Sequence, residues 1–140
     1  MALILGIDPG VNTGAAVYVD GVLKTLITVA PHQIERLIRG HQPDRVVFED
    51  SRLQSYTWTK GKTAAESAKM ARNVGQIDAW CRLITEICGE MQIPAHGISP
   101  KGKGSKVKEA EFKEHTGWTG SSNEHTRDAA MVAFPYRRAA

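Results

Sequence analysis

Short apolar runs separated by turn signals fill the first 29 residues, and this pattern restricts the fold more than any other feature of the chain. Residues 2–8 form an apolar run, and a turn through Pro9 and Gly10 leads to a second run at residues 15–19. Asp20-Gly21 is a hairpin signal, after which residues 22–29 supply a third run. The segment therefore predicts three antiparallel strands in a meander.

A helix and a fourth strand extend this meander into a mixed sheet. Pro31 stands where helices begin, residues 34–38 carry an apolar stripe, and Gly40 is expected to end the helix. Residues 45–48 are rich in strand formers and lead into Glu49. Because a helix separates this strand from the meander, we expect it to return parallel to the first strand.

The second half of the chain alternates helices with one more strand. Apolar residues recur at steps of four and three over residues 64–91, which predicts a long amphipathic helix. Residues 93–98 predict a fifth strand, and residues 107–115 a short helix closed by Gly117. A last helix is expected after the capping-box sequence of residues 121–124. The fold class is therefore α/β, with a five-stranded mixed sheet flanked by helices.

Composition limits the class of protein. The 140 residues are 41% hydrophobic and 24% charged, which is typical of one globular domain and excludes disordered and rod-like chains. No apolar run approaches the ~20 residues that a membrane span needs, so we expect a soluble, cytoplasmic protein without a membrane partner. The net charge of +3 is compatible with a polyanionic partner. Cys81 and Cys88 lie about 10 Å apart on one helix face, too far to bond, and are expected to be buried thiols.

Three acidic residues stand at informative positions of these elements. Asp8 ends the first strand, Glu49 ends the fourth, and Asp128 lies in the expected first turn of the last helix. If the two strands pair, their carboxylates lie on strands ~4.8 Å apart and repel each other unless a cation lies between them. Mg²⁺ suits this position, because one or two carboxylates hold it together with water and phosphate oxygens. His125 shares a helix face with Asp128 and could add a ligand or a proton-handling group.

Each of these residues also has a purely structural explanation. Asp8 is typical of a turn, Asp128 of a residue that favours the helix dipole, and His125 of a surface histidine. Glu49 is harder to explain in this way, because mixed sheets collect functional groups at such strand ends. The functional interpretation depends on the combination of the residues.

The order of elements and motifs resembles the RuvC-type Holliday junction resolvases of the RNase H-like superfamily, over nearly the whole chain. The specific motifs are Ile4-Leu5-Gly6-Ile7-Asp8-Pro9-Gly10 with Thr13-Gly14, Val46-Val47-Phe48-Glu49, and His125-Thr126-Arg127-Asp128-Ala129-Ala130. The resemblance implies an RNase H-like fold and a homodimeric endonuclease that uses Mg²⁺ or Mn²⁺, two ions per site, to make paired nicks in four-way DNA junctions. The products would carry 5′-phosphate and 3′-hydroxyl ends.

By motif match, the resemblance makes Asp8, Glu49 and Asp128 metal-binding catalytic carboxylates, with His125 in the fourth position. The compact chain looks closer to bacteriophage members, which implies a bacterial or phage-infected cell. Some of these members are similar to debranching nucleases with relaxed sequence preference. The family commonly carries an apolar wedge after the strand glutamate. Here Asp50-Ser51-Arg52 follow, so Leu53, Tyr56 and Trp58 are candidates for that role.

Basic and aromatic residues are the candidate DNA contacts. One group lies in and near the loop of residues 51–63 and consists of Arg52, Tyr56, Trp58, Lys60, Lys62, Lys69 and Arg72. The other lies in the loop of residues 101–108 and consists of Lys101, Lys103, Lys106 and Lys108. Aromatic side chains can stack on opened bases, and glycines between lysines let a backbone approach phosphate. The resemblance implies a catalytically important lysine in the second group, and Lys106 and Lys108 are both candidates.

Several alternatives remain open from the sequence. The helix stripe from Val74 to Cys88, with Trp80 beside it, could form a dimer contact or pack on the sheet, and Gly75 suggests a close approach. A YqgF-like RNA-processing nuclease would share the fold and the acidic strand ends. A junction-binding protein without activity is a further alternative, although all four site positions carry competent residues. The turn of residues 8–14 also resembles a sugar-kinase phosphate loop, but that fold needs two domains.

Overall fold

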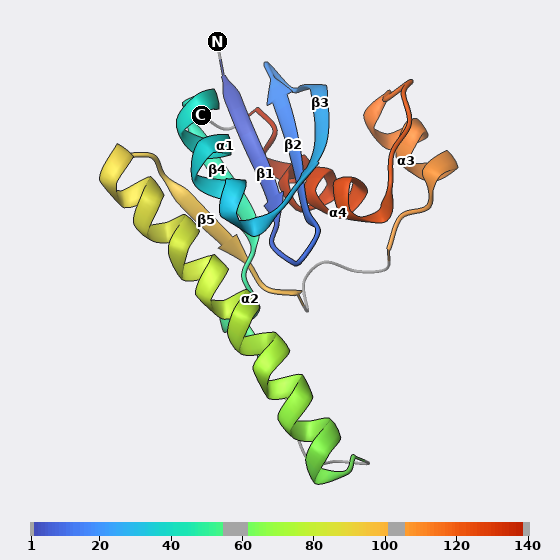
Figure 1. Ribbon diagram of the computed structural model, residues 1–140. Helices are drawn as coiled ribbons and strands as arrows, with labels where there is room; N and C mark the ends of the chain where they lie inside the picture. Colours follow the sequence, from blue (N-terminus) through green and yellow to red (C-terminus); the bar gives the residue numbers. More distant parts are fainter. Residues whose placement is uncertain (1, 55–61, 101–105, 139–140) are drawn as a thin grey trace.

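The fold is built on one mixed five-stranded sheet (Figure 1). The computed structural model describes residues 2–54, 62–100 and 106–138. The strands are β1 (Leu3–Asp8), β2 (Thr13–Val19), β3 (Val22–Val29), β4 (Arg45–Glu49) and β5 (Ala95–Ile98), in the order β3-β2-β1-β4-β5. The first three strands pair antiparallel, whereas β4 lies parallel to β1 and β5 parallel to β4. The predicted meander with two added parallel strands is confirmed.

Helices cover both faces of this sheet. They are α1 (Ile34–His41), α2 (Ala64–Met91), α3 (Glu109–Thr116) and α4 (Glu124–Ala133). Residues of α1 and α2 pack on one face of the sheet, and residues of α4 pack on the other. The N-terminal half of α2 extends well beyond the sheet (Figure 1). None of the described helices is both long and apolar enough to cross a bilayer.

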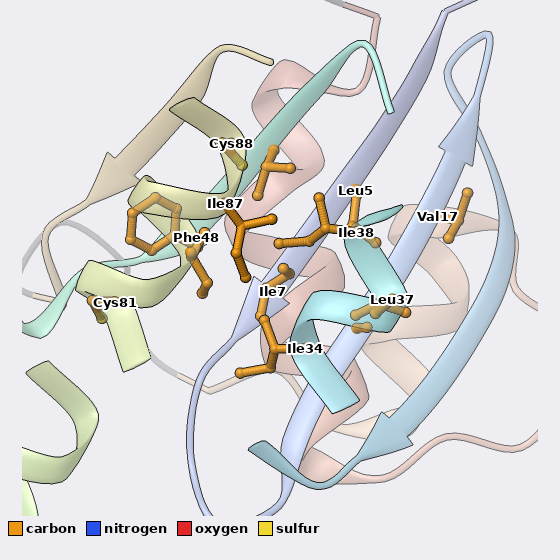
Figure 2. Packing of buried hydrophobic residues seen from close by; sticks show 13 residues of the cluster. Leu5, Ile7, Val17, Ile34, Leu37, Ile38, Phe48, Cys81, Ile87 and Cys88 are labelled. Atoms are coloured by element: carbon orange, nitrogen blue, oxygen red, sulfur yellow. The ribbon is translucent and has the colours of Figure 1, made fainter. Parts of the chain in front are cut away.

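Alternation along the strands sends side chains into two separate cores. Leu5 and Ile7 of β1 and Phe48 of β4 face α1 and α2, where Figure 2 shows them against side chains such as Ile38 and Ile87. The residues between them on β1 and β4 face α4 instead. Each fully buried aliphatic side chain contributes roughly 1.5–3 kcal/mol, so these cores hold the strand ends in a fixed register.

Two glycines allow α4 to lie directly on the sheet. A Cβ atom added at Gly6 would meet the Ala129 carbonyl and lie 2.8 Å from the Ala133 Cβ. A Cβ atom at Gly14 would overlap the His125 carbonyl. Since backbone atoms cannot move aside as side chains can, these glycines let α4 lie against the middle of β1 and the beginning of β2.

Several expected element ends differ from the structure, among them the starts of β2 at Thr13 and of α3 at Glu109, and one is confirmed. Gly40 lies inside α1, which runs to His41, and the C-cap is Gln42, which has a φ of 46° and precedes a proline. The capping box of residues 121–124 is wrong, because Asn123 caps α4 and accepts a hydrogen bond from the Thr126 amide. Strand β5 begins at residue 95 rather than 93. Gly117 does end α3, with a φ of 73°.

Both cysteines are buried and free, as expected. Burial raises the pKa of the Cys88 thiol to about 11, and burial also raises the pKa of Cys81. The Cys81 thiol donates a weak hydrogen bond to the Glu49 carbonyl over 3.5 Å. These groups are therefore core residues of the contact between α2 and β4.

Candidate active site

A cavity of about 260 Å³ opens at the ends of β1 and β4. In a sheet with parallel strands, such carboxyl ends are where ligand sites form. We call it the acidic cavity, and its lining residues are Asp8, Pro9, Glu49, Ser51, Ile77, Pro100, Lys106 and Asp128. All three carboxylates singled out from the sequence therefore line one cavity.

Strand register places the first two carboxylates together. Ile7 pairs with Phe48 in the parallel ladder, so Asp8 and Glu49 come next to each other at the same edge of the sheet. Side chains alternate along a strand, and these two share the face that α4 covers. Neighbouring anions of this kind favour a cation between them.

The third carboxylate comes from α4. Because Asn123 caps the helix, Asp128 lies at the start of the second turn and not in the first turn. The helix dipole acts mainly within the first turn, so the dipole explanation for this residue is weakened. The Asp128 side chain is 10% exposed and is held at the cavity by the close packing of α4 on Gly6 and Gly14.

One lysine enters this group of acids. Lys106 Nζ lies 3.0 Å from Glu124 Oε1 and 3.5 Å from Asp128 Oδ2. The hydrogen bond to Glu124 is the main cause that raises the pKa of Lys106, and the same bond lowers the pKa of Glu124. Lys106 lines the acidic cavity, whereas Lys108 occupies the N-cap position of α3 and does not line it.

The oxygen donors suit a hard divalent cation. Mg²⁺ needs one or two carboxylates and completes its shell with water and phosphate oxygens. Within residues 2–54, 62–100 and 106–138, no three His, Cys, Asp or Glu side chains converge closely enough to hold one ion together. The three carboxylates therefore fit an arrangement in which each ion would contact one or two of them and complete its shell with other oxygens.

The structure does not bring His125 into this group. His125 is half-buried and is not among the residues that line the acidic cavity. Its carbonyl packs against Gly14, which fixes the backbone of the residue. Its role as a fourth ligand stays a prediction.

Besides Pro9, which belongs to the motif around Asp8, three lining residues were not predicted from the sequence as site residues. Ser51 lies in the 3-10 turn Ser51–Leu53 (η2), Ile77 in α2, and Pro100 after β5. Ile77 belongs to the apolar stripe of α2, so nothing in the pattern separates it from core residues. Ser51 directly follows Glu49-Asp50, and this adjacency was the one available signal.

An ion-pair network holds the chain that follows Glu49. Asp50 is 4% exposed and faces away from the acidic cavity, where Arg52 donates to both carboxylate oxygens over 2.8 Å. Arg52 also donates to Thr85 of α2 over 3.2 Å, and Ser51 donates to Asp78 of the same helix. Burial opposes ionisation of Asp50, but the hydrogen bonds from Arg52 outweigh it and lower the pKa of that carboxyl. The network fixes η2 to α2.

Arg52→Ala is therefore expected to act on stability, because it leaves the buried Asp50 without its counter-charge. We expect a loss of about 2 kcal/mol in the free energy of unfolding, below the full cost of a buried pair because the Arg52 side chain is 35% exposed. Urea denaturation measures this loss. The matched control is Arg72→Ala, an exposed arginine of α2, for which a change within ~0.5 kcal/mol is expected. Equal losses for the two variants would contradict this role of Arg52.

The other candidate DNA contacts divide into described and undescribed residues. Lys62 and Lys69 border a hollow of about 420 Å³ on the protruding half of α2, and Ile77 lines both this hollow and the acidic cavity. Arg72 is exposed on the same half of the helix. Tyr56, Trp58, Lys60, Lys101 and Lys103 lie outside the described residues.

The two halves of the apolar stripe of α2 have different surroundings. Cys81, Ile84 and Cys88 are buried against the sheet, which favours plain packing for this half of the stripe. Met70 and Val74 lie on the protruding half and are only partly buried. Outside the backbone of its own helix, no described atom lies within 4 Å of a Cβ added at Gly75, so the expected close approach is not found in the part of the chain that the structure describes.

Comparisons with known proteins agree with the fold. No family model matches the sequence, and no curated protein is significantly similar in sequence. Among solved structures, Thermus thermophilus RuvC in complex with a Holliday junction substrate is similar at a TM-score of 0.64 and 15% identity, over 96% of this chain and 91% of that one. A second Thermus thermophilus RuvC structure is similar at 0.60 and 14%, over 94% and 91%. The chain therefore has the RNase H-like fold of the RuvC Holliday junction resolvases.

Proposed function

We propose that this protein is a structure-selective endonuclease that resolves four-way and other branched DNA junctions by metal-dependent phosphodiester hydrolysis. The observation that carries the proposal is the acidic cavity, where Asp8, Glu49 and Asp128 meet from three separate elements. The fold gives further support, because it is similar to that of a RuvC solved with a Holliday junction substrate.

The carboxylates would bind Mg²⁺ or Mn²⁺. Asp8 lies on the central strand, next to Glu49, so it is the residue placed to contact two ions, with Glu49 and Asp128 each completing one shell. Bound divalent ions supply an activated water and neutralise charge on the leaving oxygen. His125, three residues before Asp128, is the candidate for handling a proton of the attacking water.

The charge of the remaining residues suits a phosphate backbone. Lys106 places an ammonium group at the acidic cavity, and two lysines, Lys62 and Lys69, line with one acid, Glu66, the hollow that continues along α2 from Ile77. Lysines along a groove bind the backbone without regard to sequence. We therefore place one strand of the branched DNA along this half of α2, with its scissile phosphate at the carboxylates.

Paired nicks require two such sites in one assembly. A homodimer with two-fold symmetry would present two acidic cavities to two strands of a junction. Such a contact would leave free the hollow lined by Met70 and Val74, along which we place the DNA strand.

A panel of DNA substrates tests the proposed function. Purified protein is incubated with four-way, three-way, flap and linear duplex DNA and with structured RNA, each with and without Mg²⁺. We expect Mg²⁺-dependent nicks with 5′-phosphate ends in branched DNA and little cleavage of linear duplex. Cleavage confined to RNA would favour the YqgF-like alternative, and tight junction binding without cleavage would favour a binding protein.

A further inference from the structure

Lys106 bridges two carboxylates that lie one helical turn apart on α4. Its Nζ is 3.0 Å from Glu124 Oε1 and 3.5 Å from Asp128 Oδ2. Lys106 and Asp128 both line the acidic cavity, whereas Glu124 does not. The ammonium group therefore stands between one carboxylate inside the cavity and one outside it.

The two carboxylates differ in their access to solvent. The Asp128 side chain is 10% exposed, and the Glu124 side chain is 57% exposed. A divalent cation that enters the acidic cavity would contact Asp128 and not Glu124. Asp128 is thus a partner for which the ammonium and the cation compete, while Glu124 is a partner that the ammonium can keep.

The contact with Glu124 is the shorter of the two. It is a charge-assisted hydrogen bond, whereas the 3.5 Å contact with Asp128 is mainly electrostatic. The effect on pKa agrees, since the hydrogen bond to Glu124 is the main cause of the raised pKa of Lys106. Loss of the Asp128 contact would leave the stronger contact in place.

We propose that Glu124 is a positioning residue that tethers Lys106 Nζ at the rim of the acidic cavity and draws it away from Asp128 when a divalent cation binds. This inference rests on the proposed function, which supplies the cation. With Glu124 present, the displaced ammonium keeps an anionic partner and stays beside the position of the scissile phosphate. When Glu124 is neutralised, the ammonium pairs more strongly with Asp128 and opposes cation binding.

A double-mutant cycle on cation binding tests the tether. Binding of Mn²⁺ to DNA-free protein is measured from the electron paramagnetic resonance signal of free Mn²⁺. The proteins are the wild type, Glu124→Gln, Lys106→Met and the double variant. We expect Glu124→Gln to weaken Mn²⁺ binding about fivefold when Lys106 is present and less than twofold in the Lys106→Met background. Lys106→Met alone should tighten Mn²⁺ binding.

The double-mutant cycle separates the tether of Lys106 by Glu124 from a simple loss of negative charge near the cation. Loss of one negative charge near the site would weaken Mn²⁺ binding equally in both backgrounds, and that result would overturn the tether. The matched control Glu114→Gln removes an exposed carboxylate of α3 that does not line the acidic cavity, and it should leave binding unchanged.

Junction cleavage by the wild type is measured in parallel to keep the two proposals apart. Equal weakening in both backgrounds with normal wild-type cleavage would overturn the tether alone. Absence of Mn²⁺ binding by the free wild-type protein would also overturn the tether, because the tether requires a cation that displaces Lys106. Absence of both binding and cleavage would overturn the proposed function as well.

Discussion

Asp8→Asn is expected to lower Mg²⁺-dependent junction cleavage at least ~10³-fold, because it removes the carboxylate that we propose contacts both ions. Metal ions contribute several kcal/mol to stabilising the transition state, and each 1.4 kcal/mol is worth a factor of ten. Junction binding should persist or tighten, since one negative charge near the phosphate is lost. Single-turnover cleavage and a gel-shift titration measure the two effects separately.

Asp20→Asn is the matched control for this prediction. It makes the same chemical change at the hairpin between β2 and β3, where Asp20 has a φ of 51° and accepts a hydrogen bond from the Ala2 amide. Asparagine tolerates that conformation and keeps the acceptor. Cleavage by Asp20→Asn should equal that of the wild type. Normal cleavage by Asp8→Asn would remove Asp8 from the site.

Gly14→Ala is expected to lower the free energy of unfolding by about 3 kcal/mol and the Tm by roughly 10 °C. The added methyl group would overlap the His125 carbonyl and lie 3.0 Å from the Thr126 amide nitrogen. These are backbone atoms, so α4 must shift as a whole. Because Asp128 moves with α4, cleavage should fall by ~10²-fold for each ångström of displacement.

Gly89→Ala separates this steric effect from the general effect of adding a methyl group. Gly89 lies in α2, and no atom of the described residues comes within 4 Å of a Cβ added there. Alanine has the higher helix propensity, so this variant should gain roughly 0.5–1 kcal/mol. Thermal denaturation of both variants provides the measurement. A Gly14→Ala protein as stable as the wild type would show that α4 does not depend on this contact.

Local patterns were sufficient to predict the sheet and the positions of two carboxylates. Alternating apolar residues with the Asp20-Gly21 turn predict the meander, and the helix between β3 and β4 predicts the parallel return. Once β1 and β4 pair in parallel, Asp8 and Glu49 must end at the same edge. These features depend on short-range sequence signals and on the rules of strand connection.

The remaining parts of the site depend on contacts between distant segments. The bonds of Arg52 to Asp50 and Thr85 show that a residue predicted to contact DNA also belongs to a structural network. Several residues near position 123 can cap a helix, and the structure uses Asn123. Asp128 therefore lies in the second turn of α4 and not, as was predicted, in the first. The contact of Lys106 with Glu124 joins a loop residue to α4, and no periodicity in the sequence indicates it.

Anomalous diffraction from crystals of the protein grown with a four-way junction and Mn²⁺ tests most directly whether the acidic cavity binds the metal ions. We expect a manganese peak in the acidic cavity, with Asp8 and either Glu49 or Asp128 as ligands beside a phosphate oxygen of the DNA. Manganese bound only elsewhere on the protein, with the junction seated away from these carboxylates, would contradict the proposed hydrolytic site.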